Sequence, residues 1–178
     1  MELDKGPSFE ARIRDIVSRF DNRNIFDKEG KIFGEPNKNP QTLHKYISVE
    51  RKNFMPEEDE IGIVFSDNTP IEMEVVAERL QSNRCYLLMA ECKFRPNAFV
   101  GKNDIILLSK KRNFLQKRYE KMANLQGLNK PIIEECWFIS IGGFMDEAIK
   151  EAKRNDIKII DKNGINLIFK EFKEFQIR

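Results

Sequence analysis

Residues 85–95 place the strongest constraint on the fold of this chain, because they join a short apolar run to a pair of charges. The run, CYLLMAECKFR, predicts a β-strand that ends in Glu91, Cys92 and Lys93. Side chains alternate across a strand, so Glu91 and Lys93 lie on one face and Cys92 lies on the other. A carboxylate beside an ammonium at the end of a buried strand suits phosphodiester chemistry, in which the acid holds a hard cation and the lysine orients water or offsets charge on phosphorus.

The composition fits one domain with a substantial core, but it gives no overall sign of a nucleic-acid binder. The chain has 178 residues and is 40% hydrophobic, which is enough to bury a core. Its charged fraction is 34%, yet its net charge is only +2. Any basic surface must therefore come from local clustering of lysine and arginine.

The few histidines and cysteines of the chain leave carboxylates and lysines as the candidate catalytic groups. His44 is the only histidine, which removes His-based metal clusters and disfavours Ser-His-acid catalysis. Cys85, Cys92 and Cys136 are an odd number without metal-binding spacing, so we interpret them as reduced thiols of a cytoplasmic protein. The chain has no run approaching ~18 apolar residues and no apolar signal region at its N-terminus, so we expect neither a membrane span nor export.

The hydrophobic pattern alternates between helix and strand along the chain and predicts an α/β fold, a mixed β-sheet flanked by helices. Short polar connections join the first strands and favour an antiparallel meander. We expect a single domain, 1–178, with a loop-rich insertion at 21–58. The expected helices cover 8–20 (with Ser8 as N-cap), 104–124, 144–154 and 165–175, and the expected strands cover 31–33, 45–50, 60–65, 71–78, 85–94, 134–141 and 157–161.

This order of elements, with Glu91-Cys92-Lys93 at a strand end, resembles the PD-(D/E)XK nuclease superfamily, to which restriction endonucleases and archaeal Holliday-junction resolvases belong. The family places an acidic residue on the strand before the acid-X-lysine strand, and Glu74 in IEMEVVAE matches it. A rival alignment uses residues 59–65, DEIGIVF, in which Gly62 falls at the position of the metal acid and Asp59 or Glu60 would substitute. We prefer Glu74 because its strand leads directly into the lysine strand.

Two further segments resemble the family, and two features depart from it. Glu10 matches the glutamate that many members carry on the first helix, and residues 142–161 resemble the closing turn-helix-strand unit. The metal acid is glutamate where aspartate is commoner, which changes the reach of the side chain. Pro70 lies four residues before Glu74 instead of beside it.

The resemblance implies a metal-dependent endonuclease, a hydrolase that cleaves phosphodiester bonds of duplex or branched DNA. Glu74, Glu91 and the backbone carbonyl of Cys92 would hold one Mg²⁺ or Mn²⁺ ion. Lys93 would orient the attacking water and balance charge, and Glu10 would orient a metal-bound water. A homodimer that cuts two strands is also expected from the resemblance.

Local basic clusters provide candidate contacts to DNA phosphates, which would add affinity without reading bases. Two simpler readings stay open: the Glu91–Lys93 pair as a solvated strand end, and the basic cluster as an ordinary wet helix face. The alternative functions are a catalytically inactive DNA-binding protein on the same fold and a protein-interaction module that uses residues 21–58. The expected DNA-binding residues are Arg95, Lys102, Lys110, Lys111, Lys117 and Arg118.

Overall fold

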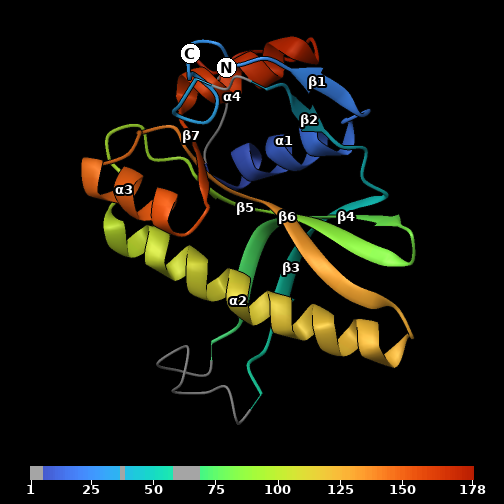
Figure 1. Cartoon of the computed structure of the whole chain (residues 1–178). Coiled ribbons are helices and arrows are strands. Elements are labelled where there is room, and N and C mark those ends of the chain that lie inside the picture. Colours follow the sequence, from blue (N-terminus) through green and yellow to red (C-terminus); the bar gives the residue numbers. More distant parts are fainter. Residues whose placement is uncertain (1–5, 37–38, 58–68) are drawn as a thin grey trace.

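The computed structural model describes residues 6–36, 39–57 and 69–178. In this part of the chain a five-stranded mixed sheet is flanked by helices on both faces, and a small two-stranded sheet lies beside it (Figure 1). The expected α/β fold with a mixed sheet flanked by helices is therefore confirmed. None of the helices among the described residues is long and apolar enough to cross a membrane.

The elements alternate between helix and strand much as the hydrophobic pattern predicts. The helices are α1 (Gly6–Ser18), α2 (Lys102–Leu125), α3 (Asp146–Arg154) and α4 (Lys162–Glu171). The strands are β1 (Arg23–Ile25), β2 (Gln41–Leu43), β3 (Ser48–Phe54), β4 (Ile71–Gln81), β5 (Arg84–Lys93), β6 (Asn129–Ser140) and β7 (Lys158–Ile160).

The main sheet has the strand order β3-β4-β5-β6-β7, antiparallel in its first half and parallel in its second. β4 and β5 form a tight hairpin, because Ser82 and Asn83 both adopt positive φ angles (52° and 57°), as a two-residue type I′ turn requires. The strands therefore extend to Gln81 and resume at Arg84, where the sequence pattern predicts a longer connection. α2 and α3 provide the crossovers that the parallel pairs need.

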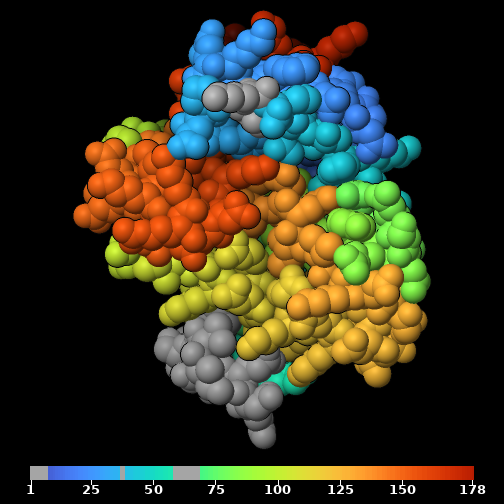
Figure 2. Space-filling model, viewed as in Figure 1, coloured from blue at the N-terminus to red at the C-terminus, as the bar shows by residue number. Residues whose placement is uncertain are grey.

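The helices form two layers, one on each face of the sheet (Figure 1). α1 and α4 pack on the face that carries Trp137, while α2 and α3 pack on the face that carries Phe138. Adjacent residues of one strand therefore pack into two separate hydrophobic cores, one on each face of the sheet. On the face in Figure 2, the N-terminal segments (blue) and the C-terminal segments (orange to red) lie together above α2 (yellow).

All four expected helix starts differ from the observed ones by two or three residues, and capping chemistry explains the start of α4. α1 begins at Gly6, so Ser8 lies within the helix and does not cap it. α4 begins at Lys162 because Asp161 caps it, its side chain accepting a hydrogen bond from the Gly164 backbone N–H at 2.9 Å.

The insertion at 21–58 contains three strands, of which β3 overlaps the expected strand 45–50, while β1 and β2 are not among the expected strands. Residues 31–33 form a turn, because the buried carboxylate of Asp27 accepts hydrogen bonds from the backbone N–H groups of Lys31, Ile32 and Phe33. β1 and β2 pair with each other, and β3 joins the edge of the main sheet. The expected strand 60–65, together with the rival acids Asp59 and Glu60 and Gly62, lies outside the described residues.

Candidate functional site

The strand pairing brings Glu74 and Glu91 together, although they lie far apart in sequence. The β4–β5 register pairs Val75 with Ala90, so the next position along the two strands sets Glu74 opposite Glu91. Opposite residues of an antiparallel pair have Cβ atoms about 5 Å apart. Both side chains are buried, with exposed fractions of 8% for Glu74 and 4% for Glu91.

A β-bulge sets the face on which Glu74 lies. Between β3 and β4, Glu50 pairs with Val76 and Lys52 pairs with Met73, so β4 contains one extra residue at this point. Met73 and Val76 both belong to the core beneath α2, while Val75 belongs to the opposite core. The extra residue therefore shifts the alternation of β4, and Glu74 lies on the α2 face together with Glu91.

Two lysines bind the two oxygens of Glu91. The Nζ atom of Lys93 lies 3.0 Å from Oε1 of Glu91, and the Nζ atom of Lys111, on α2, lies 3.2 Å from Oε2. The Lys93 side chain is 29% exposed and the Lys111 side chain is 14% exposed. The pair Glu91–Lys93 is thus part of a half-buried cluster and not a solvated strand end.

Lys111, an expected surface contact to phosphate, points toward the sheet in this structure and contacts Glu91. It lies three residues after Leu108 and four before Leu115, and both leucines face the sheet. This spacing puts Lys111 on the buried stripe of the helix. The helical period of the buried residues is the signal that could have found it.

The carboxyl groups of Glu74 and Glu91 differ in protonation state. Burial and then the charge of Glu91 raise the pKa of Glu74 from 4.5 to about 8. Burial also disfavours the charged form of Glu91, but Lys111, the hydrogen bond with Glu74, and Lys93 outweigh it and lower the pKa of Glu91. At neutral pH Glu74 therefore keeps its proton and donates it in a hydrogen bond to ionised Glu91.

Lys93 remains an ammonium in this setting. Burial lowers the pKa of Lys93, but the charge of Glu91 and the hydrogen bond to it have the larger combined effect and raise that pKa above 10.5. A charged donor therefore stands at the solvent-facing side of the buried acid pair.

One carboxyl oxygen of Glu74 lacks a partner. Among the described residues, the buried side-chain atoms without a hydrogen-bond partner are Oε2 of Glu74 and Oγ of Ser140. Ser140 pairs with Lys93 in the β5–β6 register, so both atoms belong to this site. A buried polar atom left unpaired costs about 1–3 kcal/mol. The unpaired oxygen beside a second carboxylate fits a hard divalent cation, which prefers oxygen ligands.

The structure does not add Glu10 to the acid pair. In the described part of the chain, no group of three or more His, Cys, Asp or Glu side chains is placed to hold a metal ion. Glu10 lies half-buried on α1, and its charge acts on Arg51 and on Cys92, whose side chain belongs to the core beneath α1. The role of Glu10 through a water molecule stays a prediction.

α1 contributes an arginine that the sequence reasoning missed. The Arg14 guanidinium donates a hydrogen bond to the backbone carbonyl of Glu74 at 2.9 Å. This contact holds the β4 backbone at the bulge that sets the direction of the Glu74 side chain. The only sequence signal was an arginine on the edge of the apolar face of α1, which is common in helices.

The remaining basic candidates divide into exposed and packed residues. Arg118 is turned inward, with its guanidinium carbon 5.0 Å from the centre of the Phe114 ring and NH2 donating to the Met55 carbonyl at 3.2 Å. This packing does not match the expected surface contact to phosphate. The exposed candidates are Arg95, Lys102, Lys110 and Lys117.

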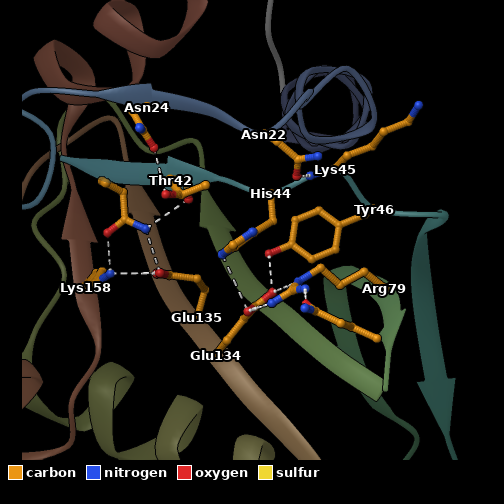
Figure 3. Close-up of polar contacts among 12 residues, drawn as sticks. Asn22, Asn24, Thr42, His44, Lys45, Tyr46, Arg79, Glu134, Glu135 and Lys158 are labelled. Atoms are coloured by element: carbon orange, nitrogen blue, oxygen red, sulfur yellow. Dashed lines mark hydrogen bonds and ion pairs between the residues drawn. The ribbon is translucent and has the colours of Figure 1, made fainter. Parts of the chain in front are cut away.

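A second polar cluster surrounds Glu134 on β6 (Figure 3). Leu87 pairs with Ile133 and Leu88 pairs with Glu135, so Glu134 is an extra residue in the strand. Both oxygens of Glu134 accept hydrogen bonds from Arg79, at 2.7 and 2.6 Å.

Loop and small-sheet residues complete this cluster. Tyr46 donates a hydrogen bond to Glu134 at 3.2 Å, and Nε2 of His44 lies 3.7 Å from the same carboxylate (Figure 3). The neighbouring Glu135 accepts hydrogen bonds from Gln41, Lys158 and Trp137.

The Glu134 cluster is satisfied from within the chain. All four carboxylate oxygens of Glu134 and Glu135 have partners. Such a network ties the small sheet to the main sheet and offers no free oxygen to a ligand. The acid pair Glu74–Glu91 is therefore the better candidate site.

Comparisons with known proteins provide little beyond this geometry. No protein-family model matches the chain, and no curated protein matches it. Among solved structures, the chain is similar to a crystal structure of a protein of unknown function, AF1548, with 22% sequence identity and a TM-score of 0.37. The match covers 70% of this chain and 58% of that one.

Proposed function

We propose that the protein is a metal-dependent deoxyribonuclease of the PD-(D/E)XK type. One observation carries the proposal: two buried glutamates from neighbouring strands meet beside the strand-end lysine, and one glutamate oxygen has no partner. Two adjacent carboxylates repel each other when both are ionised, and a divalent cation removes that repulsion. The arrangement matches the ordered acid, acid-X-lysine pattern of the sequence.

Glu74, Glu91 and the backbone carbonyl of Cys92 are the groups that would hold one Mg²⁺ or Mn²⁺ ion. Such an ion supplies a polarised phosphate oxygen and a bound water of lowered pKa. Lys93 has the position for two tasks, since its ammonium touches Glu91 and is partly open to solvent. It orients the attacking water and offsets the charge that develops on phosphorus.

The exposed basic residues supply the affinity for DNA. Arg95 lies on the segment between Lys93 and α2, Lys102 is the first residue of α2, and Lys110 and Lys117 lie two turns apart on that helix. Contacts from these side chains to phosphates would position the backbone without selecting a sequence. Cleavage of duplex or branched DNA by a homodimer in the cytoplasm belongs to the same proposal.

A plasmid-nicking assay tests the proposal. We expect the wild-type protein to nick supercoiled plasmid with Mg²⁺ or Mn²⁺ and to stop in EDTA. Glu91→Ala and Lys93→Ala are each expected to lose at least 100-fold in rate, because the groups act on the transition state. Glu72→Ala is the control, since Glu72 lies on the neighbouring strand β4, two residues before Glu74, but is exposed to solvent and pairs with Arg51.

The possible outcomes separate the proposal from its alternatives. Nicking by the wild type and Glu72→Ala, but not by the two site variants, supports the nuclease. Salt-sensitive retention of DNA without nicking would instead support a catalytically inactive DNA-binding protein. If the protein neither nicks nor retains DNA, that result contradicts both the nuclease and the inactive DNA-binding protein, and it favours a protein-interaction module.

A further inference from the structure

Both oxygens of Glu91 are bound by lysines of the chain itself. Lys93 contacts Oε1 at 3.0 Å and Lys111 contacts Oε2 at 3.2 Å. An ion that binds Glu91 must share or take one of these oxygens, and it would then stand beside two ammonium groups. At such separations like charges repel strongly when they are half-buried. Metal binding therefore competes with a lysine.

The geometry selects Lys111 as the lysine that leaves. Lys93 lies two residues from Glu91 on the same face of β5, so the strand fixes the backbone of this lysine beside the carboxylate. Lys111 comes from a different element, α2, and reaches Glu91 through a flexible four-carbon stem. Rotation of that stem alone removes the ammonium from Glu91 without moving the sheet.

The destination of the Lys111 ammonium follows from its neighbours. The helix that carries it also presents the exposed Lys110 and Lys117, which are proposed to meet DNA phosphates. A phosphate brought to α2 offers an anionic partner for Lys111 that is an alternative to Glu91. When Lys111 leaves Glu91 it loses an ion pair. A DNA phosphate replaces that ion pair, whereas water replaces it less well.

We propose that Lys111 is a positioning residue whose ammonium occupies the carboxylate of Glu91 and hinders metal binding there. A DNA phosphate that binds Lys111 would draw this ammonium away from Glu91. This inference rests on the proposed nuclease function. Its consequence is cooperative binding: DNA tightens the divalent ion, and the ion tightens DNA by the same factor. A free protein would then load metal weakly and would complete its site only on the substrate.

Binding of Mn²⁺, followed by the electron paramagnetic resonance signal of the free ion, tests the proposal without using activity. The wild type is titrated with and without a phosphorothioate duplex, which keeps its backbone charge and resists hydrolysis. We expect DNA to tighten Mn²⁺ at least tenfold, a coupling of typical size. Lys111→Met, which keeps the length of the stem, is expected to bind Mn²⁺ at least tenfold more tightly than the wild type without DNA, and to gain less than about threefold from DNA.

Control variants make the result specific. Lys121→Met removes an exposed lysine of the same helix that pairs with Glu57, and it should behave as the wild type. If Lys111→Met does not fold, as judged by circular dichroism, Lys111→Gln provides the same measurement.

Two outcomes would overturn the inference in different ways. Equal Mn²⁺ affinity of Lys111→Met and wild type without DNA rejects the role of Lys111, while Mn²⁺ binding that depends on Glu91 leaves the proposed function in place. Absence of Mn²⁺ binding in every variant, with and without DNA, overturns the inference together with the proposed function.

Discussion

Glu74 and Glu91 are residues of the same type, yet the fold keeps Glu74 protonated and Glu91 ionised at neutral pH. Glu91 touches two ammonium groups, whereas Glu74 has burial and the charge of Glu91 acting on it. The pKa of Glu74 is therefore raised to about 8 while that of Glu91 is lowered. Without a bound cation, the folded protein takes up a proton at Glu74 that the unfolded chain releases.

This proton makes stability depend on pH. The folded-state pKa of Glu74 is about 8 against 4.5 for the free group, so between these values the folded state binds more protons. The free energy of unfolding therefore falls as pH rises through this window. Glu74→Gln cannot ionise, so we expect it to be more stable than wild type at pH 8.5 by on the order of a few kcal/mol, and nearly equal at pH 5.

Urea denaturation in EDTA at the two pH values measures this difference. Glu72→Gln is the control, because Glu72 is exposed on the same strand and pairs with Arg51. An equal pH dependence in the wild type and Glu74→Gln would contradict the proton assigned to Glu74.

At the scale of elements, the turn after β6 fixes the segment that leaves Lys93. A Cβ atom at Gly142 would lie 2.1 Å from the Ala98 carbonyl oxygen and 2.2 Å from the Arg95 carbonyl oxygen. Only glycine permits this approach of two backbones. The contact holds the start of the 94–101 segment against the end of the strand that pairs with Lys93.

Gly142→Ala should therefore destabilise the protein and disturb the site. We expect a loss of about 2 kcal/mol or more in the free energy of unfolding, since backbone and not a flexible side chain must move. We also expect nicking to fall, because the strand end that carries Lys93 shifts. Gly101→Ala is the control, since its nearest neighbours would lie at 3.9 and 4.0 Å. Thermal unfolding that is unchanged in Gly142→Ala would show that the close contact is absent.

Sequence periodicity predicts most of the elements because long apolar patterns set the type of helix and strand. It places Glu91 and Lys93 on one face because alternation alone decides this. It does not predict the bulges at Glu74 and Glu134, since one extra residue in a strand leaves no mark on hydrophobicity. It also misplaces Lys111, because a charge inside an apolar stripe looks like a surface lysine until its partner on another strand is known.

At the scale of the whole molecule, the net charge of +2 hides an uneven distribution. Arg95, Lys102, Lys110 and Lys117 are exposed on the segment that leaves Lys93 and on α2. Arg118 and Lys111 are satisfied within the fold instead. The DNA affinity of the protein should therefore come from a few phosphate contacts, not from a general positive field.

Measuring DNA affinity at a series of salt concentrations tests the proposed phosphate contacts one residue at a time. Lys117→Ser should weaken DNA retention and reduce the slope of log affinity against log salt by about 0.9, the contribution of one neutralised phosphate on duplex DNA. Lys170→Ser is the control, because Lys170 is exposed on α4, on the opposite face of the sheet. Fluorescence anisotropy with a labelled duplex measures both. An unchanged slope for Lys117→Ser would remove this residue from the DNA contact.

Anomalous scattering from a crystal of the protein bound to a phosphorothioate duplex and soaked in Mn²⁺ tests the central claim most directly, because it locates the ion without depending on activity. We predict a single strong peak between the carboxylates of Glu74 and Glu91, with the proton of Glu74 lost and Lys93 still beside the site. No peak at this place, with the two carboxyl groups still hydrogen-bonded to each other, would contradict the assignment of these residues as a metal centre.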